Sequence, residues 1–437
     1  MNRDALLQIV AEWLRTLELP EPVRRDLPTI DLRRSRNILA VVGPRRSGKT
    51  FFLYQMIRDL LASGKVERAD ILFVDFEDFR LKGFRADDMD VLLGAFEQIA
   101  GRSPRYLFLD EIQHVPEWSR LLRTLHNRRR FTITVSGSNA SLLSGEIASE
   151  LRGRYLEIRM MPFSFREILR YHRLELDPAA LHTPARGRLL AAFDGYLRFG
   201  GFPETLAYPQ DQEKRRILQT YYDAIFYRDI LDRHGIKARY LLEPLMRVLL
   251  EDYAALFSIS GFAKQLAVAE LPGSKRTVAN YLRYMEEAFF VLTNEKFSYS
   301  PRRRMMNPRK VYLIDPGFGL LGGAFSEKRG ALLENVVAVE LFRRQRRMFY
   351  FKERNECDFV VQEGAKARAA WQVCWEVNAR NESREVRGLL DAMRTLDLRH
   401  GGILTYDQEG TRKSDGHKVR LIPVWKWLLD PDLEEAV

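Results

Sequence analysis

The feature that most constrains this chain is a glycine-bounded segment directly behind an apolar run. Residues 38–42 read ILAVV, and residues 43–50 read GPRRSGKT, which fits the pattern G-x-x-x-x-G-K-[ST]. The apolar run predicts a buried strand, and the residues from Thr50 onward predict a helix. A strand, a glycine-rich turn and a helix in this order predict a phosphate-binding loop.

Each residue type in this loop has a physical reason. Gly43 and Gly48 allow turns that residues with a Cβ avoid, so several backbone N–H groups can face phosphate oxygens. Lys49 reaches the outer phosphates, and the Thr50 hydroxyl takes a Mg²⁺ coordination position. ATP and Mg²⁺ are therefore the predicted cofactors. The predicted nucleotide-binding residues are Gly43, Pro44, Arg45, Arg46, Ser47, Gly48, Lys49 and Thr50.

A second motif lies at residues 106–115, which read YLFLDEIQHV. An apolar strand that ends in two acids fits a Walker B element. Asp110 is predicted to hold Mg²⁺, because a hard cation prefers oxygen ligands, and Glu111 to polarise the attacking water. Two carboxylates at a buried strand end are costly without a cation, which favours a nucleotide site over an exposed turn.

Further polar residues follow the next predicted strand. Ser138 and Asn139 are candidate sensors of the γ-phosphate or the attacking water, with a plain loop cap as the alternative. Arg152 or Arg154 could stabilise the transition-state charge, in cis or from a neighbouring subunit. An arginine supplied in trans would imply a homo-oligomeric ring, with six subunits as the expected number, although the sequence gives no oligomeric state.

Strand and helix signals alternate in the first part of the chain. This alternation predicts an α/β fold with a mostly parallel sheet and helices on both faces. The predicted strands are Ile38–Val42, Ile71–Phe76, Tyr106–Asp110, Phe131–Ser136 and Tyr155–Arg159, and the predicted helices are Thr50–Ala62, Ala86–Ala100 and Trp118–Asn127.

The rest of the chain divides into a helical region and a mixed region. Helical periodicity continues from Pro162 to about Glu295, interrupted by GGFPE at residues 200–204. Two short helices around Pro272-Gly273, the second capped by Ser274, predict a helix-turn-helix with a strand wing. We expect an N-terminal helix (1–30), an ATPase core (31–161), a helical lid (162–240), a winged-helix-like domain (241–324) and a mixed α/β domain (325–437).

The net charge and the cysteine content limit which partners and which compartment we expect. The net charge of the 437 residues is +11, and residues 301–347 hold eleven basic side chains against four acidic ones. This favours an anionic partner such as DNA, with a merely well-solvated surface as the alternative. Two cysteines make no disulfide framework, and we expect no membrane span and no signal peptide. The simple expectation is a cytoplasmic protein.

Together, VVGPRRSGKT, FLDEIQ, the stretch from SGSNASLL to FREIL and GGFPE resemble a large group of bacterial and archaeal AAA+-class ATPases. The resemblance runs from about Asp31 to about Tyr406. It implies a P-loop core of five strands, a helical lid, a winged helix and a C-terminal domain of the restriction-endonuclease-like fold, also found in archaeal Holliday-junction resolvases. It places Lys49 and Thr50 at phosphates and Mg²⁺, Asp110 and Glu111 as the Walker B pair, and Ser138 as first sensor.

The nuclease-like fold needs an acid on a helix, an Asp on one strand, and an acid-x-Lys pair on the next strand. Glu334 and Asp358 fit the first two positions, and Gln372 stands at the acid position. Cys374 stands where the lysine belongs, and a thiol cannot replace an ammonium electrostatically. We therefore expect no cleavage, with a site that has migrated to Glu376 as the less favoured alternative.

Several basic residues are candidate DNA contacts. Lys275 and Arg276 open the second helix of the predicted helix-turn-helix, where rigid scaffolding is the alternative. The remaining candidates are Arg302, Arg303, Arg304, Arg343, Arg344, Arg346 and Arg347. The favoured function is ATP-driven remodelling or migration of DNA, including branched DNA by analogy with the terminal fold. The alternatives are a nucleotide-gated signalling or defence switch that recruits a protein partner and, more weakly, a Mg²⁺-dependent nuclease.

Overall fold

The computed structural model describes residues 2–28, 30–138, 151, 153–174, 184–323, 328–414 and 417–434. The chain forms two compact units, Met1–Met161 and Pro162–Val437. Over the described ranges, no helix combines the length and the apolar character that crossing a bilayer requires.

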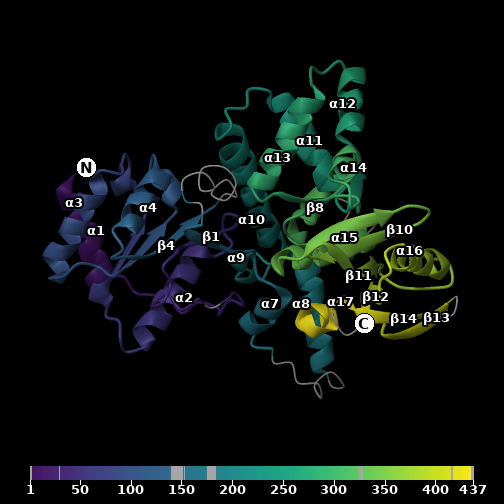
Figure 1. The fold of residues 1–437 in the computed structure, drawn as a ribbon, viewed down its shortest axis with the longest axis horizontal. Coiled ribbons are helices and arrows are strands. Elements are labelled where there is room, and N and C mark those ends of the chain that lie inside the picture. Colours follow the sequence, from purple (N-terminus) through teal and green to yellow (C-terminus); the bar gives the residue numbers. More distant parts are fainter. Residues whose placement is uncertain are drawn as a thin grey trace. The chain divides into compact units, whose positions relative to one another are not determined.

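The first unit is built on a five-stranded sheet in which all neighbours are parallel (Figure 1). Four of its strands are almost wholly buried, as expected for a parallel sheet with both faces covered. The spatial order is β2 (Ile71–Asp75), β3 (Tyr106–Asp110), β4 (Thr132–Gly137), β1 (Ile38–Val42) and β5 (Tyr155–Arg159). The five predicted strands are confirmed, with ends that differ by at most one residue.

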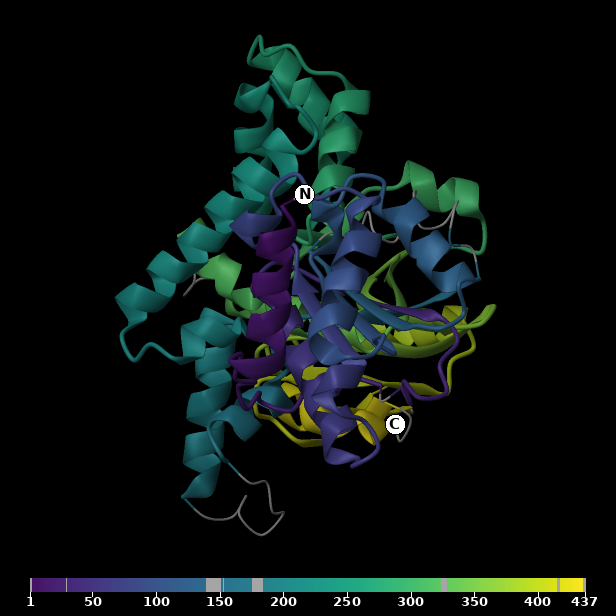
Figure 2. The same cartoon turned by 90° about the vertical axis from the view of Figure 1, so that its left-hand side faces the viewer.

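Helices cover this sheet. The N-terminal helix α1 lies alongside α3 (Figure 2), and its Trp13 side chain is buried in the core. The helices are α1 (Arg3–Arg15), α2 (Lys49–Ala62), α3 (Asp88–Ala100) and α4 (Trp118–Asn127), with short 3₁₀ turns at Arg68–Asp70, Phe79–Leu81 and Ile112–His114. Because β4 lies between β1 and β3, the phosphate-loop strand and the Walker B strand both border it.

The second unit begins with helices and a small antiparallel sheet. The sheet has the order β6 (Ala255–Phe257), β8 (Arg309–Leu313) and β7 (Val291–Asn294). The helices are α7 (Phe165–Tyr171), α8 (Ala185–Phe199), α9 (Pro203–Leu206), α10 (Asp211–Ala224), α11 (Arg239–Glu251), α12 (Ile259–Val268), α13 (Lys275–Glu287) and α14 (Pro301–Met306). A π-helical segment, Ile225–Asp232, continues α10, and a 3₁₀ segment, η6, spans Pro316–Gly322.

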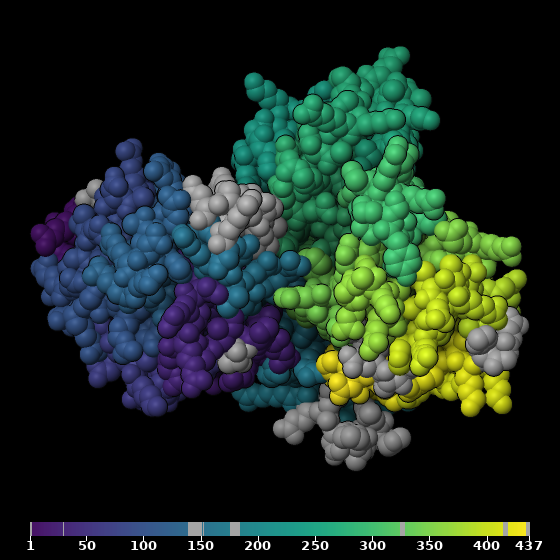
Figure 3. Space-filling view, in the orientation of Figure 1, coloured from purple at the N-terminus to yellow at the C-terminus, as the bar shows by residue number. Residues whose placement is uncertain are grey.

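The predicted helix-turn-helix corresponds to α12 and α13, which pack together and are followed by β7 and β8. The predicted cap is confirmed, since Ser274 Oγ accepts a hydrogen bond of 3.1 Å from Thr277 N. Helices α11, α12 and α13 form one projecting end of the second unit, drawn in green (Figure 3).

The GGFPE turn packs against a buried carboxylate of the same unit. Asp315 accepts hydrogen bonds from Gly201 N at 2.8 Å and Gly317 N at 2.9 Å. Gly200 has φ +73°, and a Cβ there would fall 1.6 Å from Asp315 Oδ1. Glycine is therefore required at this turn on both conformational and steric grounds.

The C-terminal part of the second unit is a six-stranded mixed sheet. Helix α16 (Glu382–Thr395) packs on β10, β11 and β12, and α15 (Arg329–Arg343) contacts β8, β9 and β11. The spatial order is β13 (Gly410–Ser414), β14 (His417–Pro423), β12 (His400–Thr405), β11 (Lys366–Val373), β10 (Glu356–Glu363) and β9 (Arg347–Lys352). Helix α17 (Val424–Leu429) and a 3₁₀ turn, Pro431–Glu434, end the described chain.

Candidate nucleotide-binding site

The loop between β1 and α2 has the backbone of a phosphate cradle. Gly48 immediately precedes α2 with φ +93°, and Arg46 also lies in the left-handed region at φ +62°. Gly43 packs directly on the residue that follows β5, because a Cβ there would fall 1.9 Å from the carbonyl oxygen of Met160. The first turn of α2 therefore presents unpaired N–H groups next to a tightly turned backbone, which is the geometry that binds phosphate.

Lys49 is buried in this loop, with 3% of its side chain exposed. Its Nζ lies 3.2 Å from the carbonyl oxygen of Pro44 and 3.3 Å from Glu111 Oε1. The ammonium thus takes its hydrogen-bond partners from the phosphate loop and from the Walker B strand end. A phosphate oxygen would be a stronger partner than the loop carbonyl, because it carries a full negative charge.

Asp110 ends β3 and is 1% exposed. Thr50 Oγ1 donates to Asp110 Oδ2 at 2.6 Å, and Ser136 Oγ donates to Asp110 Oδ1. Burial raises the pKa of Asp110 to about 6, against the lowering effect of these two hydroxyls. A buried carboxylate beside a threonine hydroxyl offers the oxygen ligands that Mg²⁺ prefers, so these residues fit the predicted cation.

Glu111 follows Asp110 with φ +49°, an uncommon conformation for a residue with a side chain. Burial acts to raise its pKa, but the Lys49 ammonium and the Gln113 amide together hold the pKa below its ordinary value. Gln113 Nε2 donates to Glu111 Oε2 and, at 3.3 Å, to Ser138 Oγ. The carboxylate is therefore ionised and held by two neighbours.

Three residues of this site carry no predicted role. Ser136 Oγ accepts a 3.0 Å hydrogen bond from Glu111 N while it donates to Asp110, so it joins both acids. Gln113 connects Glu111 to Ser138. The alternation of side chains along β4 puts Ser136 and Ser138 on one face, which is the signal that could have added Ser136 to the prediction.

The third residue without a predicted role is Arg25, whose guanidinium donates hydrogen bonds to the phosphate loop and to the end of the first unit. Its Nη1 donates to the carbonyl of Ser47 at 2.9 Å, and its Nη2 donates to the carbonyl of Met161 at 2.6 Å. No sequence signal marks this arginine, because it is far from the motif in the chain and lies in an irregular segment. The Ser47 hydroxyl is buried and has no hydrogen-bond partner among the described residues.

Arg45 points to a second acidic group at the site. Its Nη1 lies 3.0 Å from Glu77 Oε1, and His114 Nε2 lies 3.5 Å from the same oxygen. The hydrogen bond from His114 and the ion pair with Arg45 lower the pKa of Glu77 to about 2.

Two predicted residues, Asn139 and Arg152, lie outside the described residues. Arg154 directly precedes β5, where its carbonyl accepts a 2.8 Å hydrogen bond from Ile38 N. Its predicted role at the γ-phosphate stays a prediction.

The candidate DNA contacts all lie in the second unit, and they differ in how exposed their side chains are. Lys275 and Arg276 in the first turn of α13, Arg302 and Arg303 on α14, and Arg347 at the start of β9 are exposed. Arg346 is half-buried. Arg304 is turned inward, since it donates to the carbonyl of Ser298 at 2.8 Å.

Arg343 and Arg344 do not form the exposed stripe that the charge run predicts. Their side chains are 13% and 11% exposed, and both pair with Glu340. Arg343 donates to the carbonyl of Pro162 and Arg344 to the carbonyl of Trp427, each at 2.8 Å. These internal carbonyl and carboxylate acceptors draw both guanidinium groups into the protein, so this expectation is corrected.

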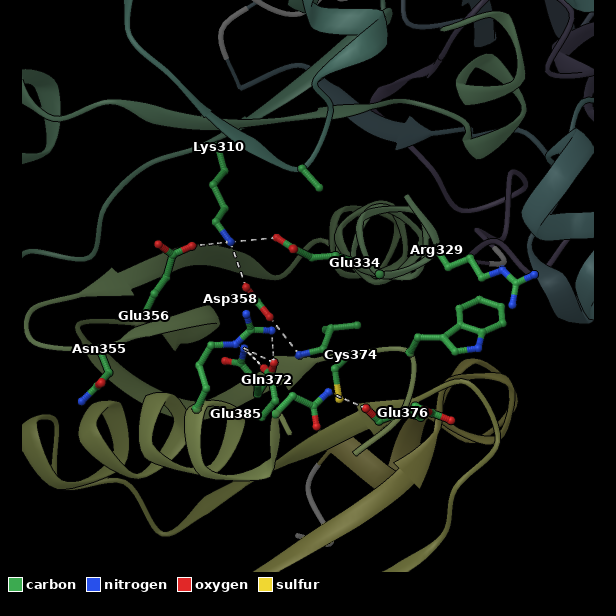
Figure 4. Close-up of a pocket in the computed structure, with 16 residues that line it drawn as sticks. Lys310, Arg329, Glu334, Asn355, Glu356, Asp358, Gln372, Cys374, Glu376 and Glu385 are labelled. Atoms are coloured by element: carbon green, nitrogen blue, oxygen red, sulfur yellow. Dashed lines mark hydrogen bonds and ion pairs between the residues drawn. The ribbon is translucent and has the colours of Figure 1, made fainter. Parts of the chain in front are cut away.

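The acids predicted from the nuclease-like pattern do come together. Glu334, Asp358, Gln372, Cys374 and Glu376 line one pocket of about 750 Å³ in the second unit (Figure 4). Burial raises the pKa of Cys374 to about 12, so its thiol is neutral at physiological pH. The pocket also contains residues that carry no predicted role there, namely Lys310, Glu356 and Glu385.

Comparison with known proteins agrees with this site. Residues 35–169 match the family described as an AAA domain, and residues 190–323 match a domain of unknown function (DUF8612). An uncharacterized protein of Methanocaldococcus jannaschii, MJ1544, is 32% identical over 434 residues, which cover 97% of this chain and 94% of that protein. An uncharacterized protein of Haemophilus influenzae is 30% identical over 332 residues, covering 74% of this chain and 79% of the other.

Solved structures show more distant likeness. The Walker-type ATPase PABY2304 of Pyrococcus abyssi is 14% identical and covers 74% of this chain and 95% of its own, with a TM-score of 0.41. The ORC1 protein of Aeropyrum pernix, solved in complex with DNA, is 16% identical and covers 77% and 92%, with a TM-score of 0.30. These scores are too low to carry an argument about function.

The phosphate cradle and the Lys49, Thr50 and Asp110 arrangement lie in the first unit, which also holds most of the AAA match, residues 35–169. The likeness to MJ1544 extends over nearly the whole chain. The chain therefore belongs to the family that includes MJ1544, and its first unit is a P-loop ATPase domain of the AAA type.

Proposed function

We propose that this protein is a Mg²⁺-dependent ATPase that uses ATP binding and hydrolysis to act on DNA. The observation that carries the ATPase part is the convergence of Lys49, Thr50, Asp110 and Glu111 on one cradle at the carboxyl ends of β1 and β3. A bound Mg²⁺ ion, held by Thr50 and Asp110, would neutralise charge on the outer phosphates.

The chain's own residues then have distinct roles. When a triphosphate occupies the loop, the Lys49 ammonium exchanges its loop-carbonyl partner for phosphate oxygens. The phosphate oxygens also compete with Glu111 for the ammonium, and the ionised Glu111 carboxylate, once released, can accept a hydrogen bond from the attacking water. Ser136 keeps Asp110 and the Glu111 backbone in register during this change.

The DNA part of the proposal rests on exposed basic residues of the second unit. Lys275 and Arg276 lie in the first turn of α13, the position from which the second helix of a helix-turn-helix contacts DNA. Arg302 and Arg303 are exposed on the nearby connection between β7 and β8. The whole chain has a net charge of +11, and the exposed basic residues of this surface favour a polyanion. Branched DNA is the substrate class that analogy with the resolvase-like fold suggests.

A nucleotide-gated switch is the second candidate, and the state of Glu111 favours it. Its carboxylate is held by both Lys49 and Gln113, so hydrolysis needs both contacts to loosen first. A protein in which this release is slow would stay in its ATP-bound conformation long enough to recruit a protein partner. Assembly into a ring with an arginine supplied in trans is compatible with either candidate.

ATP turnover measured with and without DNA separates the two. We expect duplex or four-way DNA to stimulate phosphate release, and Lys49→Ala to abolish nucleotide retention and turnover. The double variant Lys275→Ala/Arg276→Ala should weaken DNA binding and reduce the salt slope by about 1.8, about 0.9 for each lost phosphate contact. A control with the same charge change on the first unit, Lys65→Ala/Arg85→Ala, should leave both unchanged.

Unchanged turnover in Lys49→Ala would contradict the ATPase proposal itself. Normal ATP turnover that DNA does not stimulate, together with salt-independent DNA binding, would contradict the DNA part and favour the switch.

A further inference from the structure

The pocket of the second unit contains a cation supplied by the protein itself. Lys310 extends from β8 into the pocket, where its Nζ meets three carboxylates (Figure 4). The distances are 2.9 Å to Glu334 Oε1, 2.9 Å to Glu356 Oε1 and 2.8 Å to Asp358 Oδ1. The lysine belongs to the small antiparallel sheet, whereas the acids belong to α15 and β10.

The Lys310 ammonium has no donor left for another ligand. A lysine carries three N–H donors, and each of the three carboxylates takes one. Its side chain is 3% exposed, so water has little access to it. An ammonium in this state can neither hold a phosphate nor orient a water molecule, which are the tasks of a lysine in a cleavage site.

The acids are also satisfied by their surroundings. Tyr312 donates its hydroxyl to Glu334 Oε1 at 2.7 Å, and Val373 N donates to Asp358 Oδ2 at 2.9 Å. Lys352 Nζ lies 2.9 Å from Glu356 Oε2. Buried carboxylates need a positive partner and filled hydrogen bonds, and this cluster has both.

Carboxylate oxygens converging from separate elements form the ligand set that a divalent cation such as Mg²⁺ or Mn²⁺ uses. We propose that the Lys310 ammonium occupies the cation position of this acidic site, so that the domain keeps the carboxylate cluster of a metal-dependent enzyme without binding the metal. The inference concerns a different unit from the nucleotide site and does not depend on ATP hydrolysis.

One further group in this pocket has an oxygen without a partner among the described residues. Gln372 Oε1 lines the same pocket, is buried, and has no hydrogen-bond partner among the described residues. Its amide nitrogen donates to Glu385 Oε2 at 2.7 Å, which leaves the carbonyl oxygen as a free acceptor. Removing the Lys310 amine would therefore uncover carboxylate oxygens of Glu334, Glu356 and Asp358 in a pocket that also holds this free acceptor.

The test uses the full-length, nucleotide-free protein and Mn²⁺ as the probe, read by thermal unfolding and by calorimetric titration. We expect any wild-type response to Mn²⁺, including binding at Thr50 and Asp110, to be the same in Asp358→Asn. Lys310→Met keeps nearly the length of the side chain and removes its charge. We expect Mn²⁺ at a hundredfold excess over its Kd to raise the melting temperature of this variant by about 5 °C or more. Adding Asp358→Asn to this variant should remove the gain.

Two results of these Mn²⁺ measurements would overturn the proposal. One is a wild-type protein that Mn²⁺ stabilises and that loses this response in Asp358→Asn. The other is a folded Lys310→Met variant without any response to Mn²⁺. If Lys310→Met does not fold even with Mn²⁺ present, the comparison of wild type with Asp358→Asn decides. Equal shifts of the melting temperature by Mn²⁺ support the proposal, and a shift that occurs only in wild type refutes it. Nicking of supercoiled plasmid that requires Mn²⁺ and Asp358 would refute it as well.

Discussion

Replacement of Ser136 by alanine tests which hydroxyl of β4 serves the catalytic acids. Ser136 Oγ donates to the buried Asp110 carboxylate and accepts from the Glu111 backbone. A hydrogen bond to a charged group contributes about 1.5–3 kcal/mol, and an orphaned buried N–H group costs about 1–3 kcal/mol. If about half of the combined loss of roughly 2.5–6 kcal/mol falls on the transition state, turnover falls by roughly tenfold to a hundredfold.

The assay is steady-state phosphate release, with nucleotide affinity measured separately by titration. We expect a reduced kcat with little change in ATP affinity, because Ser136 touches the acids and not the phosphate loop. Ser138→Ala is the matched control, since its hydroxyl contacts only Gln113 among the hydrogen bonds described here, at 3.3 Å. Normal turnover in Ser136→Ala together with a tenfold loss in Ser138→Ala would refute this reasoning and restore Ser138 as the principal sensor.

Three further predictions concern packing, pH and charge. Gly43→Ala should destabilise the first unit by about 1–3 kcal/mol or more in chemical unfolding, because its Cβ would meet the Met160 carbonyl. Gly94→Ala on α3, where a Cβ has open space, should stabilise this unit by about 0.5–1 kcal/mol. Equal effects of the two substitutions would contradict the packing argument. Burial raises the pKa of Asp315 to about 6, so its contribution to stability is lost as pH rises from about 4 to about 6. The loss is about 3 kcal/mol, and Asp315→Asn should flatten the pH dependence of the urea midpoint; an unchanged slope would contradict this. Arg344→Ala should lower the melting temperature without altering the salt slope of DNA binding. Arg302→Ala should reduce that salt slope and leave the melting temperature unchanged. A change of the salt slope in Arg344→Ala would contradict the inward placement of its side chain.

The parallel sheet and the phosphate loop could be predicted because their signals are local. Strands β1, β2 and β3 are runs of four or five apolar residues, and the glycines of the loop mark its turns directly. Asp110 and Glu111 were identifiable as a pair since they end such a run. Ser136 carries no predicted role because the candidate sensors, Ser138 and Asn139, were sought after the strand and not on the face of β4 that includes Ser136.

The second unit shows what local patterns do not determine. Lys310 meets acids 24 and 48 residues away, and nothing in its own neighbourhood indicates that it points into a pocket. The run of arginines near residue 345 resembles an exposed stripe, but Glu340 lies one helical turn before it and the Trp427 carbonyl is brought in by the fold. The direction of a long basic side chain depends on which acceptors arrive from distant segments.

The carboxylate of Asp315 links two turns that are more than a hundred positions apart in the chain. Its two oxygens satisfy backbone donors at Gly201 and Gly317, and the left-handed Gly200 leaves room for it. A polypeptide cut between the helical lid and the wing, near residue 240, would leave this acid buried without half of its donors. We expect soluble, folded fragments of this region only when the chain is kept intact from before residue 200 to beyond residue 317. The shortest fragment worth expressing therefore includes this entire stretch, and neither half of it should fold alone.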